Sequence, residues 1–456
     1  MKSRKSLKNK PFAAPRRFPT FGGGIRIWSI DLLAIVAALL FLAPSAHAAA
    51  PEENAYASIA QLARVLVQIE NRYVDAVDRS RLVDGAIRGM VAELDPHSVY
   101  WTQSEYEAFK SEQKGEFAGV GVELDARGGG LIVIATIPGA PAERAGVKRG
   151  DRIVRVNSAD VSGGMPVDKL AKKMRGRAGT PVKLAVIRDG KPLVFDLVRE
   201  IVHLTSVTSK MLDGGVGYIR IKQFLSTTHA EFVAAVKSLM KANGGPLKRI
   251  VLDLRGNPGG LVFESSEVAD EFLDAGDIFS TRHRGVVNEK VSARRGGLLT
   301  GARVVVIVDA WSASAAELLA AALQDNDRAT VVGEITYGKG TVQATYELPN
   351  GAAVKLTTAR YYTPSGFPIH GRGITPDVAV EVPRIGLVPT HEADTEGHLV
   401  VEPQADAGAP KARPKIAVPK RQGDIEPMLH ISEIPANPAS SNDAALRIAY
   451  AIALGK

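Results

Sequence analysis

Apolar residues in residues 54–114 recur at the three- and four-residue spacing of amphipathic helices. One such stretch contains Ile59, Leu62, Val65, Leu66 and Ile69, and a second runs over residues 82–94. Asp95-Pro96-His97-Ser98 breaks the pattern, and residues 104–109 predict another short helix. The first two helices have no apolar partner within this region. We therefore expect them to pack on another domain or on a second copy of the chain.

Residues 115–200 instead alternate short β-type runs with glycine-rich turns. We predict strands over residues 119–124, 131–137, 151–156, 182–188 and 192–197. Short helices are predicted over residues 140–145 and 167–174. Such a region is typical of a compact α+β module.

Residues 201–380 repeat a strand–loop–helix unit. Strands predicted over residues 216–221, 249–254 and 303–309 lead into helices predicted over residues 229–242, 263–273 and 315–325. A strand over residues 329–333 then enters a loop around Lys339, and β-rich sequence follows to Tyr362. This alternation predicts an α/β core whose sites lie where strand ends meet helix N-termini. The predicted fold class is therefore multidomain α/β.

The two ends of the chain differ from this pattern. Residues 381–425 are rich in proline, alanine and charge and lack periodicity, which predicts a flexible linker. Residues 426–456 form a C-terminal tail, of which residues 440–454 predict one helix without an evident role.

Residues 1–48 have the layout of a secretory signal peptide. Residues 1–26 hold eight basic side chains and no acid, an apolar run follows over residues 32–43, and Ala46-His47-Ala48 offers a cleavage site. An uncleaved membrane anchor is the alternative, because the apolar run lengthens if Asp31 is tolerated. We expect a periplasmic or cell-envelope protein, with membrane contact only if this segment is retained.

Charge and composition narrow the classes of function. The net charge is +8, but residues 1–50 hold eight basic residues against Asp31 alone, so the rest of the chain is close to neutral. A nucleic-acid partner is therefore not expected. The absence of cysteine excludes disulfides and a cysteine nucleophile. No metal-binding or P-loop motif is present, and we expect neither a metal nor a cofactor.

Ser314 lies at a predicted strand-to-helix turn among the small residues Ala313, Ala315 and Ala316. Backbone N–H groups at a helix start can hold the oxyanion that forms when a serine attacks a carbonyl. An ordinary N-cap serine is the alternative.

Lys339 stands between Gly338 and Gly340, which favours a lysine inserted into a crowded site. A desolvated lysine can accept a proton near neutral pH. A phosphate-contacting or solvated lysine is the alternative.

The segment over residues 253–260 ends a hydrophobic strand with Gly256, Gly259 and Gly260, whose exposed N–H groups could serve an oxyanion. A tight connection would explain the glycines equally well, and Asp253 with Arg255 predicts a structural ion pair. His97 and His370 are candidate catalytic histidines, but neither has a matching acid in a strand-end loop, so a Ser-His-Asp triad is disfavoured.

Taken together, these segments resemble the C-terminal processing peptidases, the tail-specific proteases of family S41. The resemblance covers about residues 55–380 in the family's order. The motifs that carry it are Leu94-Asp95-Pro96-His97-Ser98, Phe117-Ala118-Gly119-Val120-Gly121-Val122, residues 253–260, Ser312-Ala313-Ser314-Ala315-Ala316-Glu317, Gly338-Lys339-Gly340-Thr341-Val342-Gln343, residues 358–366 and Gly373-Ile374-Thr375-Pro376-Asp377.

The resemblance implies an active serine endopeptidase with a crotonase/ClpP-like core over residues 201–380. The family's nucleophile falls on Ser314 and its lysine base on Lys339. The glutamine that orients the lysine matches Gln343. The oxyanion donors fall on the backbone N–H groups of Ala315 and, less directly, of Gly260.

The resemblance also identifies residues 115–200 as a PDZ domain. Such a domain captures the C-terminal tail of a protein by its carboxylate, here with the GVGV loop of Gly119, Val120, Gly121 and Val122. Protein substrates recognised by their tails are the expected partners. A homodimer and an adaptor lipoprotein stay open.

Three rival readings are weaker. A trypsin-like protease would need a Gly-x-Ser-Gly-Gly-type nucleophile and an upstream histidine, which the chain lacks. Acyl-CoA chemistry on a crotonase-like core does not explain the serine, the lysine and the PDZ module together. A scaffold that only binds tails would not need the serine and lysine at all.

Overall fold

The computed structural model describes residues 55–127, 130–162, 167–380, 390–401, 416–417 and 431–456. The chain divides into two compact units, Met1–Arg79 and Ser80–Lys456. The leader expected over residues 1–48 lies outside the described residues. In the ranges that are described, no helix has the length and apolarity needed to cross a membrane.

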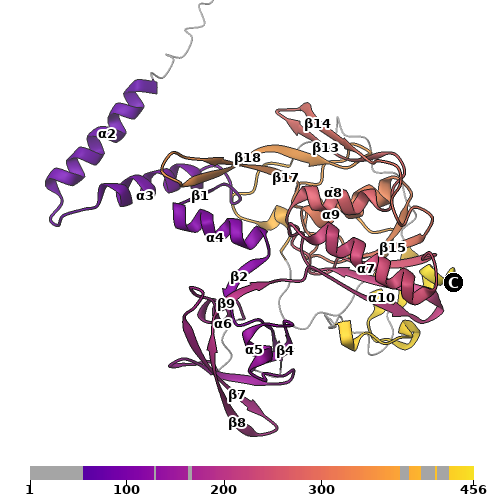
Figure 1. Cartoon of the computed structure of the whole chain (residues 1–456). Coiled ribbons are helices and arrows are strands. Elements are labelled where there is room, and N and C mark those ends of the chain that lie inside the picture. Colours follow the sequence, from indigo (N-terminus) through magenta and orange to yellow (C-terminus); the bar gives the residue numbers. More distant parts are fainter. Residues whose placement is uncertain (1–54, 128–129, 163–166, 381–389, 402–415, 418–430) are drawn as a thin grey trace, which may run out of the picture. The chain divides into compact units, whose positions relative to one another are not determined.

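The first unit contributes one described helix, α2 (Ala55–Arg72), shown in indigo in Figure 1. Its apolar residues repeat at the predicted helical spacing but are exposed, among them Tyr56, Ile59, Leu62 and Val65. Beyond its end, the guanidinium of Arg79 donates a hydrogen bond of 2.7 Å to Glu70.

The second unit opens with α3 (Arg79–Ala92), β1 (Val99–Trp101) and α4 (Gln103–Gln113). Strand β1, which the sequence pattern did not indicate, pairs antiparallel with β18 (Ala353–Tyr362). Val91 of α3 packs with Tyr100 and Ala352 in a small core. The predicted packing of a helix from this region on another domain is therefore found for α3.

Residues 122–198 form a sheet of order β3-β4-β5-β7-β8, with β6 (Ala159–Asp160) on β5. Its strands are β3 (Val122–Arg127), β4 (Gly130–Thr136), β5 (Arg152–Val156), β7 (Pro181–Arg188) and β8 (Lys191–Val198). Helices α5 (Pro141–Arg144) and α6 (Val167–Met174) accompany it. A core that includes Leu131, Ile153, Leu170 and Val186 holds this module together.

The strand predicted over residues 119–124 is divided in the structure. Strand β2 (Glu116–Gly119) pairs with β9 (Glu200–His203) in a separate two-stranded sheet. Gly121 then turns the chain with a φ of 74°, where a Cβ atom would lie 2.2 Å from the Cβ of Ala140. The turn requires glycine, because an L side chain would be strained and would clash.

A seven-stranded sheet of order β10-β11-β12-β15-β16-β19-β20 forms the centre of the second unit. Its strands are β10 (Val207–Leu212), β11 (Val216–Ile221), β12 (Arg249–Asp253), β15 (Arg303–Val308), β16 (Ala329–Gly333), β19 (Val378–Ala379) and β20 (Ile416–Ala417). Only β10 pairs antiparallel; the strands from β11 onward are parallel. A parallel sheet of this kind is the arrangement that the strand–loop–helix repeat predicted.

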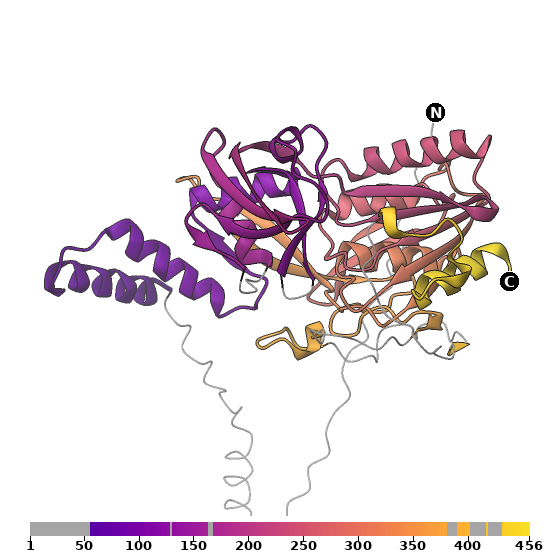
Figure 2. The same cartoon turned by 90° about the horizontal axis from the view of Figure 1, so that it is seen from below.

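Helices cover both faces of this sheet (Figures 1 and 2). Helices α7 (Thr228–Asn243), α8 (Val262–Asp270) and α9 (Ala315–Asp325) share one core with Leu252 and Val306. Helix α10 (Ala444–Leu454), shown in yellow, shares another core with Val251 and Val305. Neighbouring residues of one strand therefore enter opposite layers, as a strand's alternation requires.

Two parts of the chain differ from the sequence expectations. Strands β13 (Asp277–His283) and β14 (Val286–Ser292) join β18 and β17 (Thr341–Glu347) in a second sheet that was not predicted, and α8 ends at Asp270, earlier than expected. Within the linker expected over residues 381–425, the described residues 390–401 contain the 3-10 turn η2 (Glu392–Asp394), and Glu392 is buried. We call residues 390–401 the strap.

Candidate functional site

The loop between β12 and α8, residues 254–261, is the first component of the candidate site. Asn257 is buried, and its amide joins this loop to β11 by donating to the carbonyl of Ile221 over 3.0 Å. Gly260 has a φ of 134°, and a Cβ there would lie 2.2 Å from the carbonyl oxygen of Phe224. Gly259 comes close to the next component of the site, because a Cβ on Gly259 would lie 2.8 Å from the Cβ of Ser314. Only glycine permits this approach of the backbone.

Ser314 lies between β15 and α9, at the N-cap of α9, as the sequence predicted. Its backbone has a φ of 55° and a ψ of −115°, a region that non-glycine residues rarely occupy. Such strain persists only where neighbouring groups impose it, and it is characteristic of serines placed on sharp strand-to-helix turns. Here the carbonyl of Asn257 accepts the Ala313 N–H over 2.9 Å, which fixes the turn against the glycine-rich loop.

Glu317 joins the turn of Ser314 to the loop of Lys339. This completely buried carboxylate accepts the N–H of Ser314 over 2.7 Å, that of Gly338 over 2.7 Å and that of Lys339 over 2.9 Å. The hydroxyl of Thr336 donates a fourth hydrogen bond. Burial raises the pKa of Glu317 to about 7, against the opposing effect of these hydrogen bonds. The sequence motif contains Glu317 but did not predict this role, for which the signal is a glutamate three residues after a helix-cap serine.

Lys339 lies in the loop between β16 and β17, with most of its side chain removed from water. Burial lowers the pKa of its ammonium, while the negative charges of Glu392, Asp95 and Glu317 act in the opposite direction. Glycine is needed at position 340, beside Lys339, because a Cβ there would lie 2.2 Å from the backbone nitrogen of His370. The loop of Lys339 therefore lies against the segment of His370, in agreement with the crowded site that the flanking glycines predicted.

Gln343 lies on β17, in the same part of the molecule. Its amide donates to the hydroxyl of Thr341 over 2.8 Å and to that of Thr357 over 3.4 Å. Among the residues that the structure describes, the Lys339 ammonium makes no hydrogen bond with Gln343 or with Ser314. The three side chains are therefore brought to one region without direct bonds between them.

The backbone N–H groups of Ala315 and Gly260 were the predicted oxyanion donors. In the described part of the chain, neither group donates a hydrogen bond, although Ala315 is completely buried. Both N–H groups lie close to Ser314 in the chain or in space. Ala315 follows Ser314 directly, and Gly260 follows Gly259, whose backbone approaches the Cβ of Ser314. A buried N–H group without an acceptor, as at Ala315, is rare in proteins, and an anionic ligand would satisfy it. Gly260 is exposed, so water can also bond its N–H.

The turn at Asp95 and His97 lies beside the same site. Asp95 is buried and accepts hydrogen bonds from the backbone N–H groups of His97 and Ser98. It also accepts from the hydroxyl of Thr357 on β18, over 3.1 Å. The ring Nε2 of His97 lies 2.7 Å from Oε1 of Glu392 in the strap. This glutamate lies in the segment that the sequence pattern assigned to a linker, so pattern analysis did not find it.

Asp253 and Arg255 form the buried ion pair that the sequence predicted, with 2.6 Å between Arg255 Nη2 and Asp253 Oδ2. Burial opposes ionisation of Asp253, but the adjacent guanidinium outweighs it and lowers the pKa to about 2. Arg255 also pairs with Asp443, which caps the start of α10. The C-terminal tail is thus bonded directly to the loop after β12.

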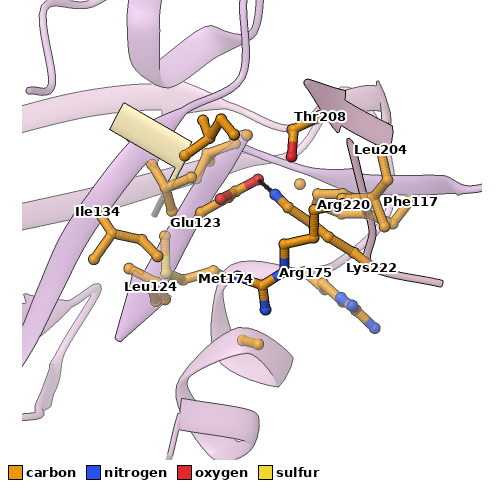
Figure 3. Close-up of a pocket in the computed structure, with 16 residues that line it drawn as sticks. Phe117, Glu123, Leu124, Ile134, Met174, Arg175, Leu204, Thr208, Arg220 and Lys222 are labelled. Carbon is orange, nitrogen blue, oxygen red and sulfur yellow. Dashed lines mark hydrogen bonds and ion pairs between the residues drawn. The ribbon is translucent and has the colours of Figure 1, made fainter. Parts of the chain in front are cut away.

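The GVGV loop of residues 119–122 lines a cavity of about 420 Å³ (Figure 3). Leu124, Ile134 and Met174 give it apolar walls, and the charged side chains of Arg175, Arg220 and Lys222 lie along it. Lys222 on the segment after β11 forms an ion pair of 2.7 Å with Glu123 on β3. The N–H groups of Val120 and Gly121 donate no hydrogen bond to any described residue. Cationic side chains and free N–H groups in an apolar cavity suit a peptide that ends in a carboxylate.

Comparisons with known proteins now identify the family. A model described as peptidase family S41 matches residues 215–380, a PDZ domain model matches residues 132–188, and a model of the activating protease CtpB N-terminal domain matches residues 43–104. The carboxy-terminal-processing protease of Bartonella bacilliformis is 38% identical over 370 residues, which cover 79% of this chain and 85% of that protein. This chain belongs to peptidase family S41.

Two further proteins are similar to this chain. The carboxy-terminal processing protease CtpA of Bacillus subtilis is 37% identical over 337 residues, covering 73% of this chain and 71% of that protein. Among solved structures, a photosystem II D1 C-terminal processing protease is 31% identical, covers 70% of this chain and 86% of that one, and has a TM-score of 0.45. The S41 chain described here is a serine-type peptidase. Its predicted fold class, with a helical N-terminal region, a PDZ domain and an S41 core, is confirmed.

Proposed function

We propose that this S41 peptidase is an exported endopeptidase that cleaves peptide bonds with Ser314 as nucleophile and Lys339 as general base. The observation that carries the proposal is the Glu317 carboxylate, which bonds the backbone N–H groups of both Ser314 and Lys339. One buried group thereby fixes the two segments that must act together. The free N–H groups of Ala315 and Gly260 support it further, since a tetrahedral intermediate needs such donors.

The reaction then proceeds by acyl transfer. Ser314 Oγ attacks the peptide carbonyl carbon while its proton passes to Lys339 Nζ, and the carbonyl electrons move to the oxygen held by the two N–H groups. Collapse of this intermediate expels the amine, which takes the proton from Lys339. Water then hydrolyses the acyl-enzyme, with Lys339 again as base. Burial supports this role of Lys339, because it lowers the pKa of the ammonium.

The dyad is tested with Ser314→Ala and Lys339→Ala in the full chain. Both are expected to reduce cleavage of a tailed protein substrate by at least about 10⁴-fold with little change in folding. Ser238→Ala and Lys237→Ala, at exposed positions of α7, are matched controls that should cleave normally. Full turnover by Lys339→Ala would rule out the dyad, and labelling of Ser314 by a fluorophosphonate probe checks the nucleophile separately.

Substrates are proposed to be proteins taken by their C-terminal tails in the cavity beside the GVGV loop. Its apolar walls and the charges of Arg175, Arg220 and Lys222 support binding of an apolar residue with a free carboxylate. Peptides with a free C-terminus should bind at least tenfold more tightly than amidated copies. Equal affinity for the two would contradict carboxylate recognition.

Export and assembly complete the proposal. The basic and apolar leader supports a periplasmic or envelope location, with membrane contact only if the leader stays attached. Cell fractionation with N-terminal sequencing of the mature protein tests this. The exposed apolar side chains of α2 support a homodimer, which sedimentation of the full chain tests. Crosslinking in the envelope with Ser314→Ala would reveal both substrates and an adaptor lipoprotein.

A further inference from the structure

The strap of residues 390–401 is bonded to the loop that carries Lys339. Glu392 donates its backbone N–H to the carbonyl of Tyr337 over 2.9 Å. The ring of His391 approaches the carbonyl of Thr336 at 3.1 Å, and the hydroxyls of Tyr337 and Thr395 lie 3.1 Å apart. A segment that follows the S41 match in the chain therefore supplies a buried carboxylate to the candidate site.

Three carboxylates act on the charge of Lys339, and they differ in their remaining hydrogen-bonding capacity. Both oxygens of Glu317 are occupied, by three backbone N–H groups and the Thr336 hydroxyl. Both oxygens of Asp95 are occupied as well, by two N–H groups and two hydroxyls. Glu392 uses only Oε1, which lies 2.7 Å from His97 Nε2.

The second oxygen of Glu392 is buried and has no hydrogen-bond partner among the residues that the structure describes. A buried carboxylate oxygen without a donor is costly, so its retention calls for an explanation. The Lys339 ammonium makes no hydrogen bond with a protein group in the described ranges, and the amide of Gln343 bonds Thr341 and Thr357. A buried acceptor without a donor thus accompanies an ammonium without a protein partner, and the charge of Glu392 acts on that ammonium.

We propose that Glu392 is a positioning residue for Lys339: its Oε2 accepts a hydrogen bond from the ammonium that forms when Ser314 transfers its proton, and His97 holds the carboxylate in place. This inference rests on the proposed function. The proton moves from Ser314 Oγ to Lys339 Nζ as the new C–O bond forms, and no proton moves to Glu392. No ion pair joins Glu392 and Lys339 in the described structure, and such contacts commonly tighten only when substrate is bound.

The charged surroundings set the pH signature of this arrangement. Burial alone would raise the pKa of Glu392, but the hydrogen bond and charge of His97 outweigh it and lower the pKa, so Glu392 is anionic near neutral pH. Asp95 and Glu317 also raise the pKa of Lys339. Lys355 is a like charge near Lys339, and His370 lies near Glu392. The Tyr337 hydroxyl faces the Glu392 carboxylate, which adds to burial in raising the pKa of Tyr337. Removing the charge of Glu392 alone must lower the pKa of Lys339.

Glu392→Gln in the full chain tests the proposal with a tailed peptide substrate. We expect kcat to fall about 30-fold, equivalent to about 2 kcal/mol, with KM changed less than about threefold. The acidic limb of the kcat profile should move to lower pH, because Lys339 deprotonates more easily. Glu392→Asp keeps the negative charge, but its shorter side chain places the carboxylate oxygen farther from Lys339. We therefore expect kcat to fall about fivefold, without a comparable shift of the acidic limb of the kcat profile. Glu396→Gln, at an exposed position of the same strap, is the matched control and should behave as wild type.

The outcomes separate this inference from the function on which it rests. The positioning role of Glu392 is overturned if the kcat of Glu392→Gln lies within twofold of wild type. It is also overturned if kcat falls while the acidic limb of the pH profile does not move and the Tm is lowered, because that result indicates a structural role. If Glu392→Gln does not fold, Glu392→Asp decides, and an unchanged kcat there overturns the inference. If wild type fails to cleave, or Ser314→Ala cleaves equally well, the proposed function itself fails.

Discussion

Two buried glutamates act on the charge of the candidate base, Lys339, and they use their oxygens differently. Glu317, in α9, accepts four hydrogen bonds and joins the segments of Ser314 and Lys339. Glu392, in the strap, accepts one hydrogen bond from His97 and keeps an unpaired oxygen. A fully bonded carboxylate stabilises a fixed backbone, whereas a half-bonded one retains capacity for a charge that appears during a reaction. The comparison separates assembly of the site from its chemistry.

The largest loss of stability is expected for Glu317→Ala, which removes the carboxylate that joins the two loops. Three backbone N–H groups and a hydroxyl would lose their acceptor inside the protein, so the free energy of unfolding should fall by about 3–5 kcal/mol. Cleavage should fall by at least about 10²-fold, because the two loops lose their common anchor. Urea unfolding and cleavage assays measure both effects. A stable variant with normal kcat would show that the loops hold their positions without Glu317.

The pH dependence of stability should have opposite signs at the two glutamates. The folded-state pKa of Glu317 is about 7, above its ordinary value of 4.5. Its contribution to the free energy of unfolding is therefore fully present below pH 4.5. This contribution falls by about 3 kcal/mol as the pH rises to 7. The pKa of Glu392 is lowered, so its contribution is present above pH 4.5 and is lost on acidification. The free energy of unfolding, measured from pH 4 to 8, tests this. The fall in stability between pH 4.5 and 7 should be absent in Glu317→Gln and present in Glu392→Gln.

A smaller effect is expected for Gly340→Ala, which disturbs the segment that both glutamates contact. The new Cβ would lie 2.2 Å from the backbone nitrogen of His370, so the loop of Lys339 must shift. We expect a loss of about 2 kcal/mol of stability and a fall in kcat of about 10²-fold. Gly301→Ala is the control, because a Cβ there has no atom within 4 Å. Equal behaviour of the two variants would contradict the steric argument.

The smallest effect is expected at the ion pair of Lys222 and Glu123, which provides an exposed counterpart to the buried carboxylates. About a third of each side chain is exposed, 34% and 29% respectively. A double-mutant cycle with Lys222→Met and Glu123→Gln should give a coupling energy below about 1 kcal/mol that weakens further in salt. A coupling above about 2 kcal/mol would show that this pair is as important to stability as the buried groups.

The sequence pattern indicates helices and strands more accurately than it indicates contacts between them. The helix beginning at Ala315 and the strand over Ala329–Gly333 have the predicted bounds, because a continuous apolar run marks a buried element. Strands β13 and β14 were not predicted, since β14 is largely exposed and lacks such a run. The strand expected through Gly121 is interrupted because Ala140, nineteen residues later, occupies the space of a side chain.

The candidate site divides in the same way. The motif order placed Ser314, Lys339 and Gln343 in one family pattern, and the structure brings them into one region. The local sequence contains no sign that Gln343 bonds Thr357, or that Glu392 meets His97 across 295 positions of the chain. Such pairs depend on how separate segments pack, and periodicity within one segment carries no information about that.

The sequence by itself determined the succession of helical region, α+β module and α/β core, and the turns that carry Ser314 and Lys339. Those features arise from local rules: apolar spacing, helix starts and glycine at close approaches. Only the tertiary structure decided that α10 covers a face of the central sheet, that Glu317 joins two loops, and that Glu392 retains an unpaired oxygen beside Lys339. Burial and hydrogen-bond satisfaction are properties of the packed molecule, because they depend on every segment that surrounds a group.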